Sequence, residues 1–328
     1  MSNFHTNTFV RRSSLIFPIN IPRFVEKAFT RGADCCVMDL EDSVPDSEKA
    51  SARSLIKESI PIVAKGGGDV SVRINQDIKL ARKDLEASVW PGLSCVSLPK
   101  VESAEEVKIR DQIISELEEK RGIQQGSIQI GIAVETALGV LSAFQIAKSS
   151  QRIVSIGVGA EDLTREMGVP VTAKGDELWY ARSKILVDAY AAGVQPFGLI
   201  GVEPFSWRDP EKILEAASYS RGLGFKGSNS IHPVPIPHLN SGFSIPKEEA
   251  DYAERALNAF DEGLRRGTAS VNVDGRMVDI ATVERCKIIL ERFQAIASIE
   301  EKKSRALKGS ESVEEKMRKA IEKAENIS

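Results

Sequence analysis

Residues 129–140 read QIGIAVETALGV, and residues 153–164 read IVSIGVGAEDLT. Each segment starts with a short, nearly continuous apolar run and reaches a carboxylate soon afterwards, Glu135 in the first and Asp162 in the second. Such runs are typical of parallel strands that helices cover on both faces. The two segments therefore predict strands of a parallel sheet, with acidic residues at the same edge.

Similar runs recur along the chain and alternate with longer helical patterns. The eight predicted strands are Ser14–Ile19, Cys35–Asp39, Val70–Ile74, Cys95–Leu98, Gln129–Val134, Ile153–Val158, Gln195–Ile200 and Asn229–Ile231. The helical patterns between them include Glu102–Lys120, Asp176–Ala192 and Pro210–Arg221. This alternation predicts an α/β fold of the (β/α)8 TIM-barrel type, which needs about 250 residues. A doubly wound open sheet is the alternative that the strand count leaves open.

The chain has 328 residues and continues beyond the predicted barrel. A helix with apolar residues spaced by three and four is expected at Lys247–Arg266. A tight turn at Asp274-Gly275 and a second helix at Ala281–Ala297 follow it. We therefore expect three parts, which are a (β/α)8 barrel domain at 11–240, a C-terminal helical extension with a lid loop at 241–299, and a charged tail at 300–328 that is helical or partly disordered.

The composition is that of an ordinary globular chain, with 42% hydrophobic and 28% charged residues and a net charge of −3. This balance argues against nucleic acid as a partner, and no apolar run reaches the roughly 18 residues of a membrane span. The N-terminal sequence MSNFHTNTFVRRSS lacks the apolar stretch of a secretory signal. We expect a cytoplasmic protein, while its two arginines and lack of acids leave an organellar presequence open. The cysteines are expected to be reduced core residues; they are Cys35, Cys36, Cys95 and Cys286.

Charged residues follow or end strand after strand of the predicted barrel. These residues are Glu41 and Asp42 after the second strand, Arg73 at the third, Lys100 at the fourth, Glu135 after the fifth and Asp162 after the sixth. Barrel enzymes build their active sites at the carboxyl ends of the strands. The pattern therefore predicts a polar site at one mouth of the barrel.

The residue types at this mouth are compatible with two interpretations. Glu135 and Asp162 could hold Mg²⁺, which prefers oxygen ligands, or could simply pair with Arg73 and Lys100. The planar guanidinium of Arg73 suits a substrate carboxylate but also suits a salt bridge. Lys100 could form a Schiff base or act as an electrostatic partner of the acids. The spacing alone does not decide between these roles.

The sequence lacks the motifs of several other enzyme classes. There is no HExxH motif, and the three histidines, His5, His232 and His238, are too scattered for a zinc site. The segment GVGAED at 157–162 has Asp162 where a dinucleotide-binding loop has its third glycine. No GxSxG elbow supports a serine hydrolase.

The residues at the mouth belong to a series of motifs that resembles the HpcH/HpaI aldolase and citrate lyase β-subunit family, in its CitE-like branch. The matching motifs, in the order of that family, are RRSSLIFP (11–18), DLEDSV (39–44), KASAR (49–53), VRIN (72–75), LPKVES (98–103), VETALGV (134–140), GAEDLT (159–164), IHP (231–233) and DGRMVD (274–279). They extend over about residues 11 to 295. Each motif is modest alone, and the series is specific.

This resemblance implies a Mg²⁺-dependent (β/α)8 carbon–carbon lyase, for which Mn²⁺ is a possible substitute metal. Its substrate would be a hydroxy-dicarboxyl-CoA thioester of the malyl-, citramalyl- or citryl-CoA type, cleaved to an acyl-CoA and an oxoacid. Glu135 and Asp162 match the metal ligands of the family, and Glu41 and Asp42 would hold metal-bound waters. The family also forms trimers or hexamers, so the resemblance implies a homotrimer or homohexamer.

The resemblance assigns further roles at and beyond the mouth. Arg73 matches the residue that binds the oxoacid carboxylate, and we expect Lys100 and Arg12 to contribute to substrate binding. Asp279 matches an acidic residue in a C-terminal lid, which in relatives can close over the site of a neighbouring subunit. Our hypothesis is that Asp279 exchanges the proton at the enolate carbon, while Arg73 orients the oxoacid.

Some positions depart from the family pattern and leave other functions open. Ser228 follows Gly227 where a lysine is usual, Pro235 takes the place of a frequent glutamine, and an aspartate expected on the seventh strand is replaced around Gly198. Asn20 lies in a region where glycine is frequent. These departures concern the acyl-carrier region more than the metal site. The alternatives are a metal-dependent aldolase on a free oxo- or hydroxyacid, a CoA thioester hydrolase, and a silent subunit of a lyase complex.

Overall fold

The computed structural model describes residues 8–172, 174–201 and 208–327. Residues 1–7, which would form part of an organellar presequence, lie outside these ranges. Eight parallel strands form one sheet in the order β7-β6-β5-β4-β3-β2-β1-β8. A parallel bridge between Phe197 and Gly227 joins the two edges of this sheet. The ring of strands is therefore nearly closed, which confirms the barrel and excludes the open sheet.

The strands lie close to their predicted positions. They are β1 Ser13–Pro18, β2 Cys35–Asp39, β3 Asp69–Arg73, β4 Cys95–Leu98, β5 Gln129–Val134, β6 Ile153–Val158, β7 Gln195–Phe197 and β8 Ser228–Ser230. The largest difference is β7, which ends at Phe197 and not at Ile200. Pro196 lies within this strand and has no N–H for the ladder, so the pairing is short.

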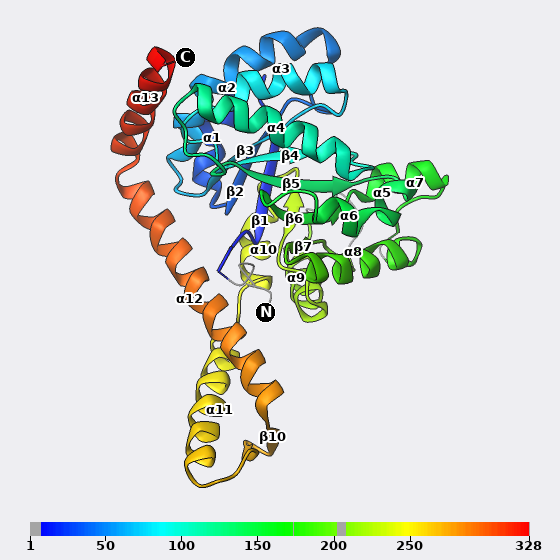
Figure 1. Cartoon of the computed structure of the whole chain (residues 1–328), viewed down its shortest axis with the longest axis vertical. Coiled ribbons are helices and arrows are strands. Elements are labelled where there is room, and N and C mark those ends of the chain that lie inside the picture. Colours follow the sequence, from blue (N-terminus) through cyan, green and yellow to red (C-terminus); the bar gives the residue numbers. More distant parts are fainter. Residues whose placement is uncertain (1–7, 173, 202–207, 328) are drawn as a thin grey trace.

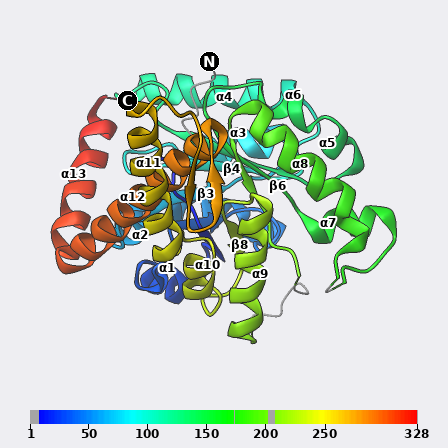
Figure 2. The ribbon, with the colours of Figure 1, turned by 90° about the horizontal axis from the view of Figure 1, so that it is seen from below.

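Helices surround the strands (Figures 1 and 2). They are α1 Pro22–Ala28, α2 Lys49–Ala64, α3 Ile78–Ser88, α4 Ala104–Lys120, α5 Ala137–Leu141, α6 Ala143–Ala147, α7 Ala160–Met167, α8 Trp179–Ala192, α9 Pro210–Leu223 and α10 Ile236–Gly242. Short 3-10 turns cover Phe29–Arg31, Asp46–Glu48 and Asp176–Leu178. The main core lies between strands and helices and includes Val72, Val96 and Ile130, all fully buried. Within the described ranges, every helix is too short or too polar to cross a membrane.

The C-terminal extension begins as an arm that points away from the barrel (Figure 1). We define the arm as residues 247–290, which comprise α11 Lys247–Arg265, the hairpin of β9 Val271–Val273 and β10 Arg276–Val278, and the first part of α12 Ile280–Lys308. Phe260 of α11, Val278 of the hairpin and Val283 of α12 share a separate small apolar core. The arm therefore holds its own shape at a distance from the barrel.

The tail of the chain is helical and packs against the barrel in the part that the structure describes. The helix α12 runs on to Lys308, and α13 covers Ser310–Ile327. Lys303 is buried and donates to Asp34 at 2.8 Å, while Ile321 and Ala324 are the buried residues of α13. The tail is thus helical, which is one of its two expected forms, and it is docked on the barrel. Its sparse apolar residues fall on one helix face, and its charges find partners on the barrel.

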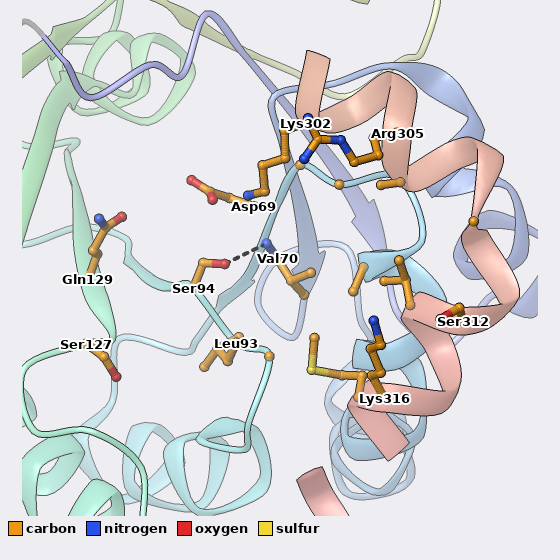
Figure 3. Close-up of a pocket in the computed structure, with 18 residues that line it drawn as sticks. Asp69, Val70, Leu93, Ser94, Ser127, Gln129, Lys302, Arg305, Ser312 and Lys316 are labelled. Atoms are coloured by element: carbon orange, nitrogen blue, oxygen red, sulfur yellow. Dashed lines mark hydrogen bonds between the residues drawn. The ribbon is translucent and has the colours of Figure 1, made fainter. Parts of the chain in front are cut away.

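Docking of the tail leaves a cavity of about 710 Å³ at the amino ends of the strands, which we call the floor of the barrel. Figure 3 shows Lys302 and Arg305 of α12 and Lys316 of α13 on one side of this cavity. Asp69 and Ser94 lie on the barrel side, where Ser94 Oγ accepts a hydrogen bond from the Val70 N–H at 3.2 Å. The tail therefore covers the floor, and the opposite end of the barrel is left for the predicted site.

Candidate active site

The carboxyl ends of the strands surround a cavity of about 570 Å³, which we call the mouth cavity. Its lining includes Asp42 after β2, Arg73 at the end of β3, Glu135 after β5 and Asp162 in α7. The cavity continues into the barrel, where small polar side chains line it; these are Ser14, Ser71, Ser97, Ser155 and Ser228. The fold therefore brings the predicted mouth residues from separate strands into one space.

Glu135 and Asp162 face each other across the turn from β6 to α7. The Gly159 N–H donates to the Val134 carbonyl oxygen at 2.9 Å, so the two strand ends are held together. Burial, and then a hydrogen bond and charge repulsion from Asp162, raise the pKa of Glu135 to about 8. The hydrogen bond from Glu135 lowers the pKa of Asp162, and Lys100 and Arg165 act in the same direction. Without a metal, this pair of carboxyl groups shares a proton.

This donor set fits a hard divalent cation. Two carboxyl groups that share one proton can exchange it for a metal ion, because the ion relieves the repulsion that raised the pKa. Among the described residues, no cluster of three or more His, Cys, Asp or Glu side chains is arranged to hold a metal. Mg²⁺ commonly uses only one or two protein carboxylates and fills its other positions with water or substrate oxygen. Glu135 and Asp162 therefore suit Mg²⁺ better than zinc.

Lys100 links the acidic groups of the mouth. Its ammonium contacts Glu41, lies 3.0 Å from both carboxylate oxygens of Asp42, and lies 3.7 Å from Asp162. Its backbone has a φ of 51°, a left-handed conformation that is uncommon outside glycine and recurs at functional sites. Burial alone would lower the pKa of Lys100, but the hydrogen bonds to Glu41 and Asp42 outweigh it and raise this pKa. The amine stays protonated, so the geometry favours an electrostatic partner over a Schiff-base nucleophile.

Arg73 is fixed by an aspartate that the sequence pattern did not single out. Asp39, at the end of β2 and fully buried, accepts from Arg73 Nε and Nη2 at 2.7 Å each. Burial raises the pKa of Asp39, but the hydrogen bonds from Arg73 outweigh it and lower this pKa. Arg73 Nη1 lies 3.2 Å from Glu41. Asp39 is the first residue of the DLEDSV motif, two positions before Glu41. Because side chains two apart in a strand point to the same side, this spacing was the signal in the sequence that Asp39 also belongs to the mouth.

Further buried polar residues hold the acidic loop after β2 in place. Lys49 of α2 donates from Nζ to the carbonyl oxygens of Leu40 at 3.0 Å and Glu41 at 2.8 Å. Asn75 Nδ2 donates to the same Leu40 oxygen at 2.9 Å and is itself tied to the buried Asp84. The KASAR motif therefore contributes Lys49 as a support of the mouth, and the VRIN motif contributes both Arg73 and the supporting Asn75.

Two predicted site residues do not lie in the mouth cavity of this chain. Arg12 precedes β1 at the floor, where it is buried and donates to both oxygens of Asp34 at 2.8 Å. The prediction that Arg12 binds substrate is therefore not retained, because its side chain lies at the floor and is not part of the mouth cavity. Asp279 lies on the arm, where its Oδ1 accepts from the Thr282 N–H at 2.9 Å and caps α12. The arm carries it away from its own barrel (Figure 1).

Comparison with known proteins agrees with this geometry. The model of the family HpcH/HpaI aldolase/citrate lyase matches residues 12–233. The citrate lyase subunit beta of Leuconostoc mesenteroides subsp. cremoris is 33% identical over 290 residues, covering 88% of this chain and 95% of that protein. The mitochondrial citramalyl-CoA lyase of Rattus norvegicus is 30% identical over 293 residues, covering 85% of each protein. A structure of CitE from Mycobacterium tuberculosis with magnesium, acetoacetate and coenzyme A is 28% identical, with a TM-score of 0.67 over 88% of this chain and 99% of that one.

Proposed function

Because the chain belongs to the HpcH/HpaI aldolase/citrate lyase family, we propose that it is a Mg²⁺-dependent lyase of hydroxyacyl-CoA thioesters. It cleaves a carbon–carbon bond of a hydroxy-dicarboxyl-CoA, of the malyl-, citramalyl- or citryl-CoA type, and releases an acyl-CoA and an oxoacid. The observation that carries this proposal is the proton-sharing pair of Glu135 and Asp162 beside the fixed guanidinium of Arg73. Together they offer a metal position and a carboxylate receptor in one cavity.

Glu135 and Asp162 would hold the Mg²⁺, which when bound supplies positive charge next to the substrate oxygen that changes from hydroxyl to carbonyl. Arg73 orients the carboxylate of the oxoacid half, and Asp39 keeps the guanidinium in place for it. Lys100 keeps the carboxylates of Glu41 and Asp42 directed towards the mouth. Glu41 and Asp42 would then accept hydrogen bonds from waters at the metal position.

The reaction balances with two proton transfers. The substrate hydroxyl passes its proton to a water that Glu41 and Asp42 would hold as the carbon–carbon bond breaks. The electrons of that bond move to the thioester fragment as its enolate. The enolate carbon then takes up a proton, which we assign to Asp279 of a second copy of the chain. Asp279 lies on an arm directed away from its own barrel, so a second copy within a homotrimer or homohexamer would receive it.

A free hydroxy- or oxoacid is the second candidate substrate. Ser228 at the start of β8 lines the mouth cavity and replaces the lysine that the family pattern places there. A serine gives no positive charge to a coenzyme A phosphate, which would weaken CoA binding. This observation favours a metal-dependent aldolase as the alternative.

The test is a cleavage assay with and without Mg²⁺ on malyl-CoA, citramalyl-CoA, citryl-CoA and the corresponding free acids. Oxoacid released together with an intact acyl-CoA supports the lyase, and release of free thiol indicates thioester hydrolysis instead. Cleavage of free acids alone would move the assignment to the aldolase. Full activity in EDTA would contradict the proposed role of Glu135 and Asp162.

A further inference from the structure

The cations that line the mouth cavity differ in how they are neutralised. Arg73 pairs with Asp39 and lies near Glu41, so two acids fix its position before any substrate is present. Arg182, in the first turns of α8, lines the same cavity and is partly buried. Among the described residues, no side chain forms an ion pair or hydrogen bond with Arg182. It is therefore a guanidinium in the mouth with no acidic partner in that part of the chain.

Apart from the exposed Glu161, the acids in or next to the cavity have other partners. Asp42 pairs with Lys100, while Asp162 lies between Lys100 and Arg165. Glu177 is the acid whose charge acts on Arg182, yet its carboxylate accepts from the Thr172 N–H at 2.8 Å and from the Thr172 hydroxyl at 2.9 Å. An unpaired guanidinium that is partly removed from water is costly, which is the condition that favours binding of an anion.

The local backbone is shaped to leave room for this guanidinium. Gly175 has a φ of 67°, and a Cβ atom at this position would lie 2.6 Å from Arg182 Nη1. The seventh strand adds no acid, because Phe197, Gly198 and Leu199 are the residues that line the cavity there. Among the described residues, the Arg182 guanidinium therefore lies in the cavity lining against the Gly175 loop, with no acid from β7 beside it.

We propose that Arg182 binds a second carboxylate on the oxoacid half of the substrate, so that the chain prefers dicarboxylic oxoacids. This inference rests on the proposed lyase function and specifies its substrate class. One carboxylate is received by Arg73 beside the metal position, and the other by Arg182. A planar guanidinium receives a carboxylate through two parallel hydrogen bonds, which gives geometric selectivity as well as charge. A substrate whose oxoacid half carries a methyl group in that place leaves Arg182 unpaired.

Citryl-CoA and citramalyl-CoA form a matched pair for testing this assignment. Both release acetyl-CoA, and they differ only in a carboxymethyl or a methyl group on the oxoacid half. The wild-type chain should cleave citryl-CoA with a kcat/KM about 10²-fold or more above that for citramalyl-CoA, since a site built for a polar group rejects the analogue that lacks it. Arg182→Gln should lose at least about tenfold on citryl-CoA and change little on citramalyl-CoA, and Arg182→Lys should recover part of the loss.

Binding of the oxoacids alone gives a second readout that does not depend on turnover. With Mg²⁺ present, calorimetric titration should show oxaloacetate binding more tightly than pyruvate to the wild type, and Arg182→Gln should reduce only the oxaloacetate affinity. Equal losses on both thioesters, with oxoacid binding unchanged, would assign Arg182 to a phosphate of coenzyme A and overturn the proposal. A lowered melting temperature with equal losses everywhere would make Arg182 structural, which also overturns it.

The two proposals fail in different ways. If the wild type cleaves neither thioester but Arg182→Gln selectively loses oxaloacetate, the lyase function fails and the carboxylate site stands. If both thioesters are cleaved with equal efficiency and Arg182→Gln has no selective effect, the lyase function stands and the role of Arg182 is wrong.

Discussion

The side chain of Glu135 occupies the space above Gly159, where a Cβ atom would fall 2.5 Å from Cγ and 2.8 Å from Cδ of Glu135. Gly159 also caps the start of α7, the helix that carries Asp162. The absence of a side chain at position 159 thus permits the approach of the two carboxyl groups. It is a requirement of the site that is separate from the ligands themselves.

Gly159→Ala should therefore displace Glu135 and weaken Mg²⁺ binding and cleavage by about 10- to 100-fold, the range seen when the support of a metal ligand is lost. The φ of −83° at Gly159 suits alanine, so the backbone itself is not strained. Titration calorimetry with Mg²⁺ and initial rates measure the two effects. Gly222→Ala is the control, because a Cβ atom at position 222 would have no neighbour within 4 Å and no change is expected. Unchanged Mg²⁺ affinity in Gly159→Ala would contradict the assignment of Glu135.

Asp39→Asn should disturb Arg73 without touching the metal position. The buried Asp39 makes two hydrogen bonds of 2.7 Å to the guanidinium, so neutralising it leaves a buried cation with poorer partners. We expect kcat/KM to fall by about 10²–10³ and the free energy of unfolding to fall by about 3 kcal/mol. Steady-state kinetics and urea unfolding measure these changes, and Asp46→Asn, at an exposed position, is the control. A normal kcat/KM would remove Arg73 from substrate binding.

The shared proton of Glu135 predicts how Mg²⁺ binding depends on pH. Because the pKa of Glu135 is about 8 without metal, the ion must displace a proton below that pH. The apparent affinity should rise by about tenfold per pH unit as the pH approaches 8, and should level off above it. Titration in buffers with different ionisation enthalpies counts the protons released. Asp162→Asn removes a proposed ligand as well as the repulsion, so it should bind Mg²⁺ more weakly and keep the part of the dependence that burial causes. Affinity that does not vary with pH in the wild type would exclude the shared proton.

The same raised pKa affects stability in the absence of metal. The folded chain holds a proton on Glu135 that the unfolded chain releases above its ordinary pKa of 4.5. The free energy of unfolding should therefore fall as the pH rises from about 4.5 to about 8. Glu135→Gln should flatten this slope in denaturant unfolding at several pH values. Other groups titrate in the acidic part of the range, so the difference between the two proteins is the quantity to compare.

The docked tail should stabilise the barrel without taking part in the chemistry of the mouth. Ile321 of α13 is 5% exposed, and replacing a buried isoleucine with alanine typically costs about 2–5 kcal/mol. We expect urea unfolding to show a loss in this range for Ile321→Ala, with Mg²⁺ affinity unchanged. Lys319→Ala, on the exposed face of the same helix, should have little effect. If Ile321→Ala lost Mg²⁺ affinity under conditions in which the variant is fully folded, the docked tail would affect the mouth and this prediction would be wrong.

A site shared between two copies predicts complementation. Glu135→Gln and Asp279→Asn should each be nearly inactive, since one lacks a metal ligand and the other lacks the proposed proton donor. After the two variants are unfolded and refolded together, about a quarter of the sites should combine an intact Glu135 with an intact Asp279 from a neighbouring copy. Cleavage rates of the mixture measure this recovery. Recovery would fail if Asp279 served the barrel of its own chain.

Several features of the fold could be predicted because they depend on local sequence. The apolar runs at Cys95–Leu98, Gln129–Val134 and Ile153–Val158 match β4, β5 and β6 residue for residue. In a parallel barrel, all strands have their carboxyl ends at the same mouth, so residues that directly follow a strand lie at that mouth. The positions of Glu135 and Asp162 at the mouth therefore followed from the strands.

Other features depend on partners that lie far apart in the sequence. Arg12 and Arg73 both lie next to or at the end of a strand. Arg12 forms an ion pair with Asp34 at the floor, whereas Arg73 lies at the mouth and pairs with Asp39. Lys303 of the tail likewise donates to Asp34, although the two residues are 269 positions apart in the sequence. Local patterns give no information on which of many charged groups will meet, since this depends on the packing of whole elements.

The sequence by itself determined the alternation of strands and helices, the barrel, and the end of it at which the acids gather, because hydrophobic periodicity and strand direction act within a few residues. Only the tertiary structure decided which charges are neutralised. It pairs Arg73 with Asp39 and closes the floor with the tail, and it leaves Arg182 without an acid in the described part of the mouth. Electrostatic interactions depend on distance and burial in three dimensions, so the charges available to a substrate emerge only once the chain is folded.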